Sequence, residues 1–161
     1  MSASPFNVLF LCTGNSARSI MAEATLNHLA GPSGRFHAYS AGSYPKGEPN
    51  PLALALMAAE GISTAGVRSK RWDEFLAADA PPIHLVVTVC DAAAGEQCPL
   101  YPGKPLKVHW GVADPHTAAE FKRAYTALRQ RIEQFIKLSV ETLDRADLQK
   151  RITEIGRVGN V

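Results

Sequence analysis

The sequence has only three cysteines, a formal net charge of +2 and no apolar run long enough to cross a membrane. Three cysteines do not make the disulfide framework of a small secreted domain, so reactive thiols or metal ligands are the alternatives. So small a charge gives no reason to expect nucleic acid as a partner. The N-terminus lacks a basic region followed by an apolar stretch. We therefore expect a cytoplasmic protein that binds neither nucleic acid nor a membrane.

Internal repeats and low-complexity segments are also absent. Of the 161 residues, 46% are hydrophobic and 20% are charged, a balance typical of an ordinary globular protein. A chain of this length is expected to form one domain with a core of its own.

The most informative stretch is residues 7–19, Asn-Val-Leu-Phe-Leu-Cys-Thr-Gly-Asn-Ser-Ala-Arg-Ser. An apolar segment precedes Cys12, and small turn-forming residues follow it. A segment with helical apolar periodicity begins near Ile20. This order predicts a strand, a loop and a helix, with Gly14 providing for a positive φ. Successive backbone N–H groups between Thr13 and Arg18 would then form an anion-binding concavity at the start of the helix.

Cys12 lies at the rim of this concavity. We expect the oriented amides and the Arg18 guanidinium to lower the pKa of its thiol, which would make it a nucleophile near neutral pH. Arg18 can also hold two oxygens of a tetrahedral oxyanion with its planar fork. The alternative is a buried structural cysteine at a strand end. The loop is predicted to bind an oxyanion through Thr13, Gly14, Asn15, Ser16, Ala17, Arg18 and Ser19.

Strands and helices are predicted to alternate along the rest of the chain. Asn50-Pro51 and Thr117-Ala-Ala-Glu120 are typical helix starts, and Ser40-Ala41-Gly42 ends a strand with residues small enough for another loop to approach closely. Alternation of this kind favours an α/β fold with a four-stranded parallel sheet, helices on both faces and an extra C-terminal helix. Besides the strand at 7–11, we expect strands at 36–40, 84–90 and 107–110, helices at 20–29, 52–60, 118–136 and 143–155, and a short helix at 72–78.

Three predicted strand ends carry residues that could take part in chemistry. Cys12 and Cys90 each follow a strand, and Asp114-Pro115 opens the loop after another. Ligands of parallel sheets bind outside the carboxyl ends of the strands, so these residues are expected to converge on one cleft. Asp114 is a candidate general acid, and the alternative is a surface turn.

Cys90 and Cys98 have two interpretations. Together with His84 and His109 they could bind zinc, but the closely spaced ligand pairs of structural zinc sites are absent. A redox pair is better supported, because Cys98 lies in a segment, 91–105, that contains glycine and several prolines and shows no periodicity. We therefore predict no metal site.

Residues 12–19, Cys-Thr-Gly-Asn-Ser-Ala-Arg-Ser, resemble the phosphate loop of low-molecular-weight protein tyrosine phosphatases and of the arsenate reductases with the same fold. Ser40-Ala41-Gly42, Cys90, Cys98, His109-Trp110-Gly111 and Asp114-Pro115 resemble the reductase branch in order and spacing. The resemblance covers about residues 6–138, so residues 1–161 are expected to form one low-molecular-weight phosphatase-like domain with a helical extension at about 139–161.

The resemblance implies reduction of arsenate to arsenite, in the service of arsenic detoxification. Cys12 would attack arsenate held by the loop and Arg18, and Asp114 would protonate the departing oxygen. Cys90 would then attack Cys12 to release arsenite, and Cys98 would carry the oxidation to the surface. No bound cofactor is implied, but an external reductant is needed: thioredoxin, or glutathione or mycothiol with a glutaredoxin.

Two other functions remain open: a low-molecular-weight phosphatase acting on phosphotyrosine or small phosphate esters, and a non-catalytic oxyanion or thiol sensor. Ala17 stands where the phosphatases usually carry cysteine, and His116 where they carry tyrosine, and both differences weaken the phosphotyrosine interpretation. The segment from Cys90 to Cys98 is one residue longer than in thioredoxin-coupled reductases, so the electron donor is open.

Lys70 is a further candidate. Some reductases with this fold hold an alkali cation behind the phosphate loop, and we expect the Lys70 ammonium to lie there, near Asn15, Glu23 and Ser40. The alternative is a lysine exposed on the approach to a helix.

Overall fold

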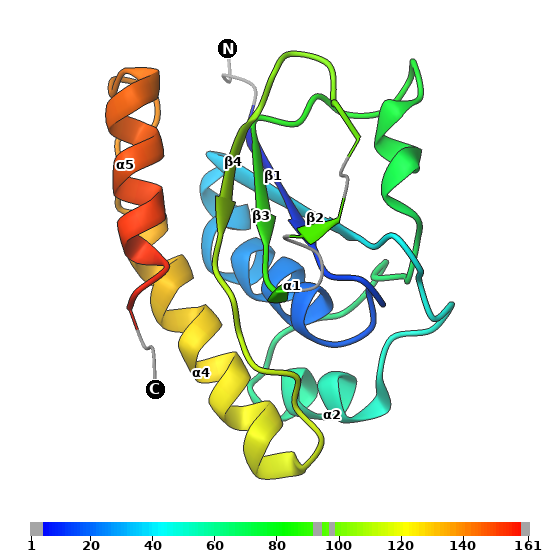
Figure 1. Ribbon diagram of the computed structural model, residues 1–161. Coiled ribbons are helices and arrows are strands. Elements are labelled where there is room, and N and C mark those ends of the chain that lie inside the picture. The colour runs from blue at the N-terminus through cyan, green and yellow to red at the C-terminus, as the bar shows by residue number, and fades with distance from the viewer. Residues whose placement is uncertain (1–4, 92–94, 97–98, 159–161) are drawn as a thin grey trace.

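The computed structural model describes residues 5–91, 95–96 and 99–158, which form a parallel sheet packed against helices (Figure 1). The strands are β1 (Phe6–Leu11), β2 (Phe36–Ala41), β3 (Leu85–Thr88) and β4 (Leu106–His109). They pair in the order β2-β1-β3-β4, and every pair is parallel. The predicted α/β fold with a four-stranded parallel sheet is therefore confirmed.

The third strand is shorter than the apolar run at 84–90 indicated. It ends at Thr88, so Cys90 lies beyond it in the connection to the next segment. Hydrogen bonds to the neighbouring segments continue for one more residue: the Val89 N–H donates to the Leu11 carbonyl at 2.9 Å, and the Val89 carbonyl accepts from the Val112 N–H at 2.9 Å.

The helices are α1 (Arg18–Ala30), α2 (Pro51–Ala59), α4 (Ala118–Phe135) and α5 (Arg145–Ile155). Both predicted helix starts are confirmed: Asn50 caps α2, and Thr117 and Glu120 form both halves of a capping box on α4. The described residues also contain two short 3-10 helices, η1 (Gly31–Ser33) and η2 (Trp72–Leu76), and η2 takes the place of the short helix expected at 72–78. No helix in the described ranges has both the length and the apolar composition that crossing a bilayer requires.

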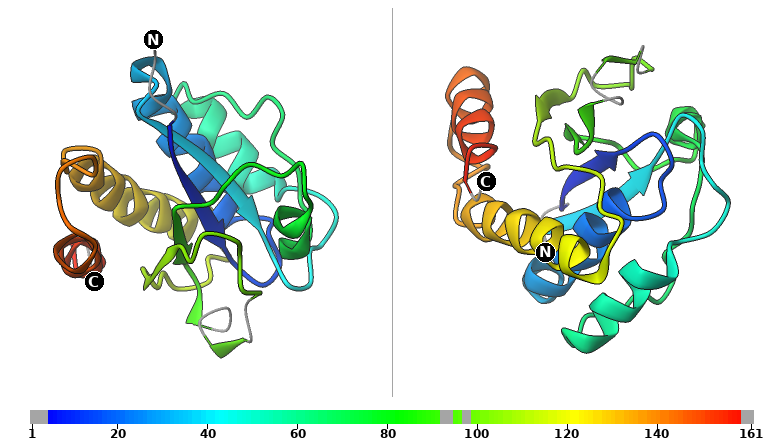
Figure 2. Two further views of the ribbon diagram at one scale, coloured as in Figure 1. Left: turned by 90° about the horizontal axis from the view of Figure 1, so that it is seen from above. Right: turned by 60° about the horizontal axis from the view of Figure 1, so that its bottom comes forward.

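The two faces of the sheet are covered differently. Val8 and Phe10 pack in a core with residues of α1 and α4, which lie on the same side of the strands in the right-hand view of Figure 2. Leu9 and Leu11, which alternate with them, pack in a second core with Trp72 of η2. Burying each of these large apolar side chains contributes about 1.5–3 kcal/mol, so the sheet is held from both sides.

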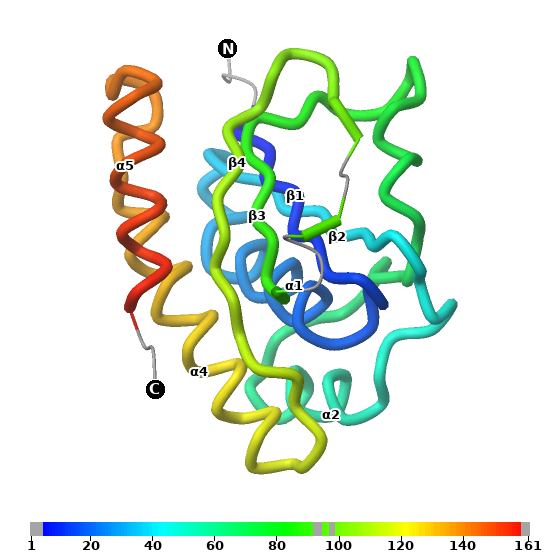
Figure 3. Tube along the Cα trace, in the orientation of Figure 1, coloured from blue at the N-terminus to red at the C-terminus, as the bar shows by residue number. Residues whose placement is uncertain are grey.

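The C-terminal helix α5 packs on this domain. It runs beside the edge strand β4 (Figures 1 and 3), and Leu148, Ile152 and Ile155 join the core formed with α4. The Trp110 indole N–H donates to the Ile152 carbonyl at 2.9 Å. α5 therefore contacts the start of the loop that carries Asp114.

Arg131 of α4 connects the same parts of the chain. It is 1% exposed, and it donates hydrogen bonds to the carbonyls of Trp110 at 3.0 Å and of Val158 at 2.9 Å. One side chain thus joins α4, the start of the 110–117 loop and the residues after α5.

Gly156 lets α5 approach β4 this closely. A Cβ there would lie 2.8 Å from the Trp110 Cδ1 atom and 3.0 Å from the His109 carbonyl oxygen. We expect Gly156→Ala to lower the free energy of unfolding by about 1–3 kcal/mol, the usual cost of overpacking, measured by urea denaturation. Gly31→Ala is the matched control, because Gly31 has a helical φ of −54° and no atom within 4 Å of the added Cβ. Equal stability of the two variants would contradict the close packing of α5.

Candidate active site

The segment between β1 and α1 forms a tight loop around Asn15. Asn15 has a φ of 41°, a left-handed conformation that asparagine tolerates better than most residues. Its side-chain amide donates to Ser19 Oγ at 2.9 Å and to Ser40 Oγ at 3.0 Å, and its oxygen accepts from the Lys70 N–H at 2.8 Å. The prediction of a positive φ at Gly14 is wrong. The left-handed residue is the next one, Asn15, whose side chain has three hydrogen-bond partners.

Gly42, at the end of β2, allows the loop to lie against the sheet. A Cβ on Gly42 would overlap the carbonyl oxygens of Cys12 and Thr13. The predicted close approach at Ser40-Ala41-Gly42 is thus confirmed. It holds the loop backbone in one position relative to the sheet.

The N-terminus of α1 is open toward the loop. Ala17 is the cap residue, and no side chain caps the helix. The first N–H groups of a helix have no partner within the helix, so those of α1 are available to an anion.

Arg18 joins this loop to the Asp114 loop. Its Nη1 donates to the Val112 carbonyl at 2.8 Å, and its Nη2 lies 3.3 Å from Asp114 Oδ1. Its Nε is buried, and in the described part of the chain it has no hydrogen-bond partner. A buried guanidinium donor without a partner is suited to bind an anion, because leaving it unpaired is costly.

Asp114 lies at the solvent side of this contact. Its side chain is 60% exposed, and His116 Nε2 lies 3.6 Å from its second oxygen. The carboxyl can therefore exchange protons with solvent while it remains beside Arg18.

Cys12 and Cys90 form a buried thiol pair, with exposures of 5% and 2%. The expected low pKa of Cys12 is wrong for this geometry: a hydrogen bond with Cys90 and burial raise the pKa of the Cys12 thiol. Arg18 and the Gly14 N–H act in the opposite direction but are outweighed. A proton must therefore leave the pair before either sulfur can act as a nucleophile.

Thr13 and Glu96 extend this pair. The Thr13 N–H donates to Cys90 Sγ at 3.5 Å, and Thr13 Oγ1 lies 3.8 Å from the same sulfur. Glu96 accepts from Thr13 Oγ1 at 3.1 Å and from Ser43 Oγ at 2.6 Å. Glu96 is not predictable from the sequence, because a single glutamate in an irregular segment has no pattern that marks it.

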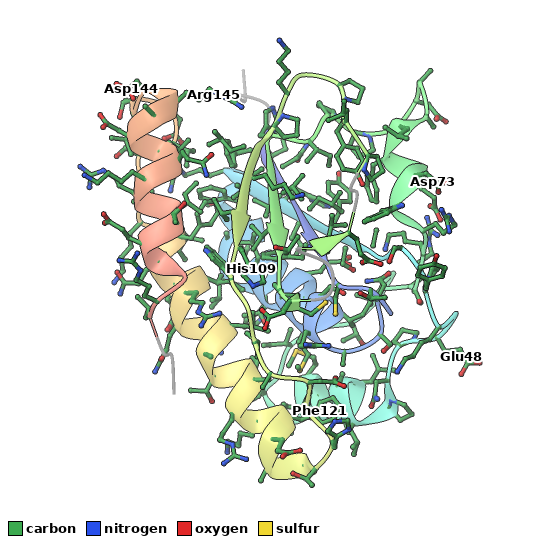
Figure 4. All side chains as sticks on the ribbon, in the orientation of Figure 1. Glu48, Asp73, His109, Phe121, Asp144 and Arg145 are labelled. Atoms are coloured by element: carbon green, nitrogen blue, oxygen red, sulfur yellow. The ribbon has the colours of Figure 1, made fainter. Side chains whose placement is uncertain are left out.

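Of the four residues considered for zinc, the three in the described part of the chain do not form a metal-binding cluster. His84 precedes β3 and stacks on Phe6, whereas Cys90 follows the other end of that strand. His109, at the carboxyl end of β4 in Figure 4, faces Asp91 at 2.8 Å and Thr88. Cys98 lies outside the described residues.

Glu23 and Lys70 form a buried pair behind the loop, where Lys70 was expected. Their side chains are 11% and 7% exposed, and Lys70 Nζ lies 4.0 Å from Glu23 Oε1. The same Glu23 oxygen accepts from Ser40 Oγ, which also contacts Asn15. Burial raises the pKa of Glu23 and lowers the pKa of Lys70, which shows that each charge needs the other.

Removing the lysine should expose this dependence. We expect Lys70→Met to lower the free energy of unfolding by about 3–5 kcal/mol at pH 7, because it leaves a buried carboxylate without its cation. The loss should grow as pH rises through the folded-state pKa of Glu23, since burial makes losing that proton unfavourable.

Urea denaturation in potassium and in choline salts is the measurement, with Lys122→Met on the exposed face of α4 as control. Adding Glu23→Gln to Lys70→Met should restore most of the loss. A Lys70→Met variant with unchanged stability and activity at every potassium concentration would contradict the role of this pair.

Residues 7–150 match the sequence profile of the family described as low molecular weight phosphotyrosine protein phosphatase. Arsenate reductase 2 of Staphylococcus saprophyticus is 36% identical over 130 residues, which are 80% of this chain and 94% of the relative. The arsenate reductase of Halalkalibacterium halodurans is 38% identical over 136 residues, which are 80% of this chain and 93% of the relative.

Solved structures resemble this fold as well. The thioredoxin-dependent arsenate reductase of Corynebacterium glutamicum superposes with a TM-score of 0.64 at 31% identity, over 84% of this chain and 63% of that one. This chain thus spans less than two thirds of that protein. A low molecular weight protein tyrosine phosphatase from T. tengcongensis superposes with a TM-score of 0.68 at 26% identity, over 82% of this chain and 98% of that one.

Proposed function

The chain belongs to the low molecular weight phosphotyrosine protein phosphatase family, and within that family we propose that it reduces arsenate to arsenite, in the service of arsenic detoxification. The observation that carries the proposal is the buried contact between Cys12 and Cys90 beside an anion-binding loop. Phosphoryl transfer through Cys12 needs no second thiol, whereas reduction needs one. Relatives named arsenate reductases at 36–38% identity support the same function.

Arsenate binding is the first step. The loop amides and the N-terminus of α1 hold the tetrahedral oxyanion, and the Arg18 Nε donates to one of its oxygens. The Asp114 carboxyl, 3.3 Å from the Arg18 Nη2, then lies beside the bound ion.

Chemistry begins with attack of the Cys12 sulfur on arsenic. An oxygen leaves as Asp114 gives it a proton, which produces an arsenic(V) thioester on Cys12. Solvent exposure of Asp114 lets the carboxyl regain its proton for the next turnover.

The second thiol completes the reduction. Cys90 attacks the Cys12 sulfur, so that the sulfur–sulfur bond forms while the sulfur–arsenic bond breaks. The electron pair of the broken bond stays on arsenic, which leaves as arsenite. Two thiols have then given two electrons, and the protein is left with a disulfide in the cleft.

Cys98 and an external reductant would restore the starting state. Cys98 follows Cys90 within the Gly- and Pro-containing segment 91–105, and its attack on Cys90 would free Cys12 and move the disulfide outward. Thioredoxin is the favoured reductant, because the name of the Corynebacterium glutamicum relative states that dependence. Glutathione or mycothiol with a glutaredoxin is the alternative.

Phosphatase activity is the second candidate function. The loop, Arg18 and Asp114 would serve phosphoryl transfer equally well, and the T. tengcongensis phosphatase shares the fold at 26% identity. Water would then resolve a phosphocysteine, and Cys90 would take no part. A sensor that only binds oxyanions would show neither turnover.

Turnover of arsenate with a dithiol donor, measured beside hydrolysis of an aryl phosphate, separates these functions. We expect arsenate reduction in the wild type and none in Cys12→Ser, which should still bind the oxyanion through the loop amides. Arg18→Lys should lower kcat/KM by about 10²–10³-fold, because a lysine cannot reproduce the guanidinium contacts.

Cys90→Ser is the matched control for that experiment. It should abolish arsenate reduction and retain aryl phosphate hydrolysis, because only reduction uses the second thiol. Arsenate reduction that survives in Cys12→Ser would show that the nucleophile is wrongly assigned. Phosphatase turnover without any arsenate reduction in the wild type would favour the second candidate.

The path of oxidation can be mapped by mass spectrometry after one equivalent of arsenate, with no added thiol. We expect a disulfide between Cys90 and Cys98 in the wild type. In Cys98→Ser we expect one between Cys12 and Cys90, because the relay stops there. Three free thiols after that single turnover would exclude the relay, and a small thiol attacking Cys12 directly would take its place.

A further inference from the structure

Glu96 connects two hydroxyl groups at the rim of the active site. Its Oε1 accepts from Thr13 Oγ1 at 3.1 Å, and its Oε2 accepts from Ser43 Oγ at 2.6 Å. Thr13 follows Cys12 in the loop, and Ser43 follows the glycine against which the loop packs. Glu96 also lines a small hollow with Tyr44 and Arg71, so one titratable hydroxyl and one cation face it from the neighbouring segments.

The Thr13 hydroxyl leads from this carboxylate to the second thiol. Thr13 Oγ1 is 3.8 Å from Cys90 Sγ, and the Thr13 N–H donates to the same sulfur at 3.5 Å. Cys90, Thr13 and Glu96 thus form a continuous chain of contacts. The thiol stands at its buried end, 2% exposed, and the half-buried carboxylate stands at the other.

The proposed reaction requires a route of this kind. A thiolate, and not a thiol, attacks a sulfur, so Cys90 must lose its proton in a site that water reaches poorly. Cys90 is 2% exposed, so its proton needs an acceptor within the protein. Asp114, the other carboxyl group assigned to the reaction, is paired with Arg18 at 3.3 Å and serves the departing oxygen.

We propose that Glu96 accepts, through the hydroxyl of Thr13, the proton that Cys90 gives up when it attacks Cys12. This inference rests on the proposed arsenate reduction. The Cys90 thiol proton passes to Thr13 Oγ1 as the Thr13 hydroxyl proton passes to Glu96 Oε1. Cys90 forms the bond to the Cys12 sulfur, and the sulfur–arsenic electron pair reduces arsenic. The Thr13 N–H stabilises the sulfur while it is charged, and solvent takes the proton from Glu96.

A purely structural function would not require a carboxylate here. A negative charge beside an oxyanion site opposes arsenate binding, and a glutamine could bridge Thr13 and Ser43 without that cost. The unfavourable charge is explained if the group must take up a proton. Glu96 acts through Thr13 and so positions and deprotonates the attacking thiol without touching arsenic.

Rapid-mixing single turnovers test this, with one equivalent of arsenate, no added thiol, and arsenite release and loss of free thiols as readouts between pH 6 and 9. We expect Glu96→Gln to release arsenite about 10²-fold more slowly at pH 7, within the range for lost general-base catalysis. The deficit should shrink as pH approaches the ordinary thiol pKa of about 8.5, because hydroxide then replaces the carboxylate. Glu96→Asp should recover part of the rate.

Ser43→Ala is the matched control, because it removes one anchor of Glu96 but leaves the path through Thr13. Its rate is expected to stay within about threefold of the wild type, with the wild-type pH profile. An equal loss in Ser43→Ala and Glu96→Gln, with no pH dependence, would show that Glu96 only fastens the segment and would overturn the proposal.

The same measurements distinguish the role of Glu96 from the arsenate reductase activity itself. Wild-type rates in Glu96→Gln at every pH would overturn the role of Glu96 and leave arsenate reduction intact. A wild-type protein that does not reduce arsenate at all would overturn both.

Discussion

The arrangement of the site depends on one constraint, the left-handed turn of the backbone at Asn15. Anion binding requires several N–H groups to point at one place, and in a loop a left-handed residue beside right-handed ones turns successive N–H groups toward the same side. Asn15 supplies the reversal and has three side-chain partners, on α1, on β2 and in the backbone of Lys70. The elements around the loop therefore hold it in shape before an anion arrives.

This arrangement explains why charged residues are buried away from the reaction. The Glu23–Lys70 pair lies behind Ser40, which accepts from Asn15, so a change in its charge would reach the loop through two hydrogen bonds. A buried ion pair rarely adds stability over apolar residues, but breaking one is costly. Such a pair restricts the loop to one conformation more than it stabilises the fold.

The site also combines opposing demands on its sulfur atoms. Burial brings Cys12 and Cys90 into contact, which suits disulfide formation, yet the same burial raises the pKa of the Cys12 thiol and opposes its nucleophilic role. Arg18 and the loop N–H groups act against this only in part in the anion-free structure. A path that removes protons is therefore as necessary to such a site as the thiols themselves. Elsewhere, α5 and Arg131 contact Trp110 at the start of the Asp114 loop, so the C-terminal extension supports the candidate acid.

The sequence by itself determined the elements, the phosphate-loop motif and the candidate residues Cys12, Arg18, Cys90 and Asp114. These follow from local rules: apolar runs make strands, caps such as Asn50 begin helices, and a cysteine before an arginine-containing turn marks an anion loop. Only the tertiary structure decided that Asn15 and not Gly14 takes the positive φ, that the pKa of Cys12 rises, and that Glu96 meets Thr13 across 83 positions of sequence. These properties depend on how deeply a group is buried and on which distant group lies within hydrogen-bonding reach. No pattern of neighbouring residues encodes them.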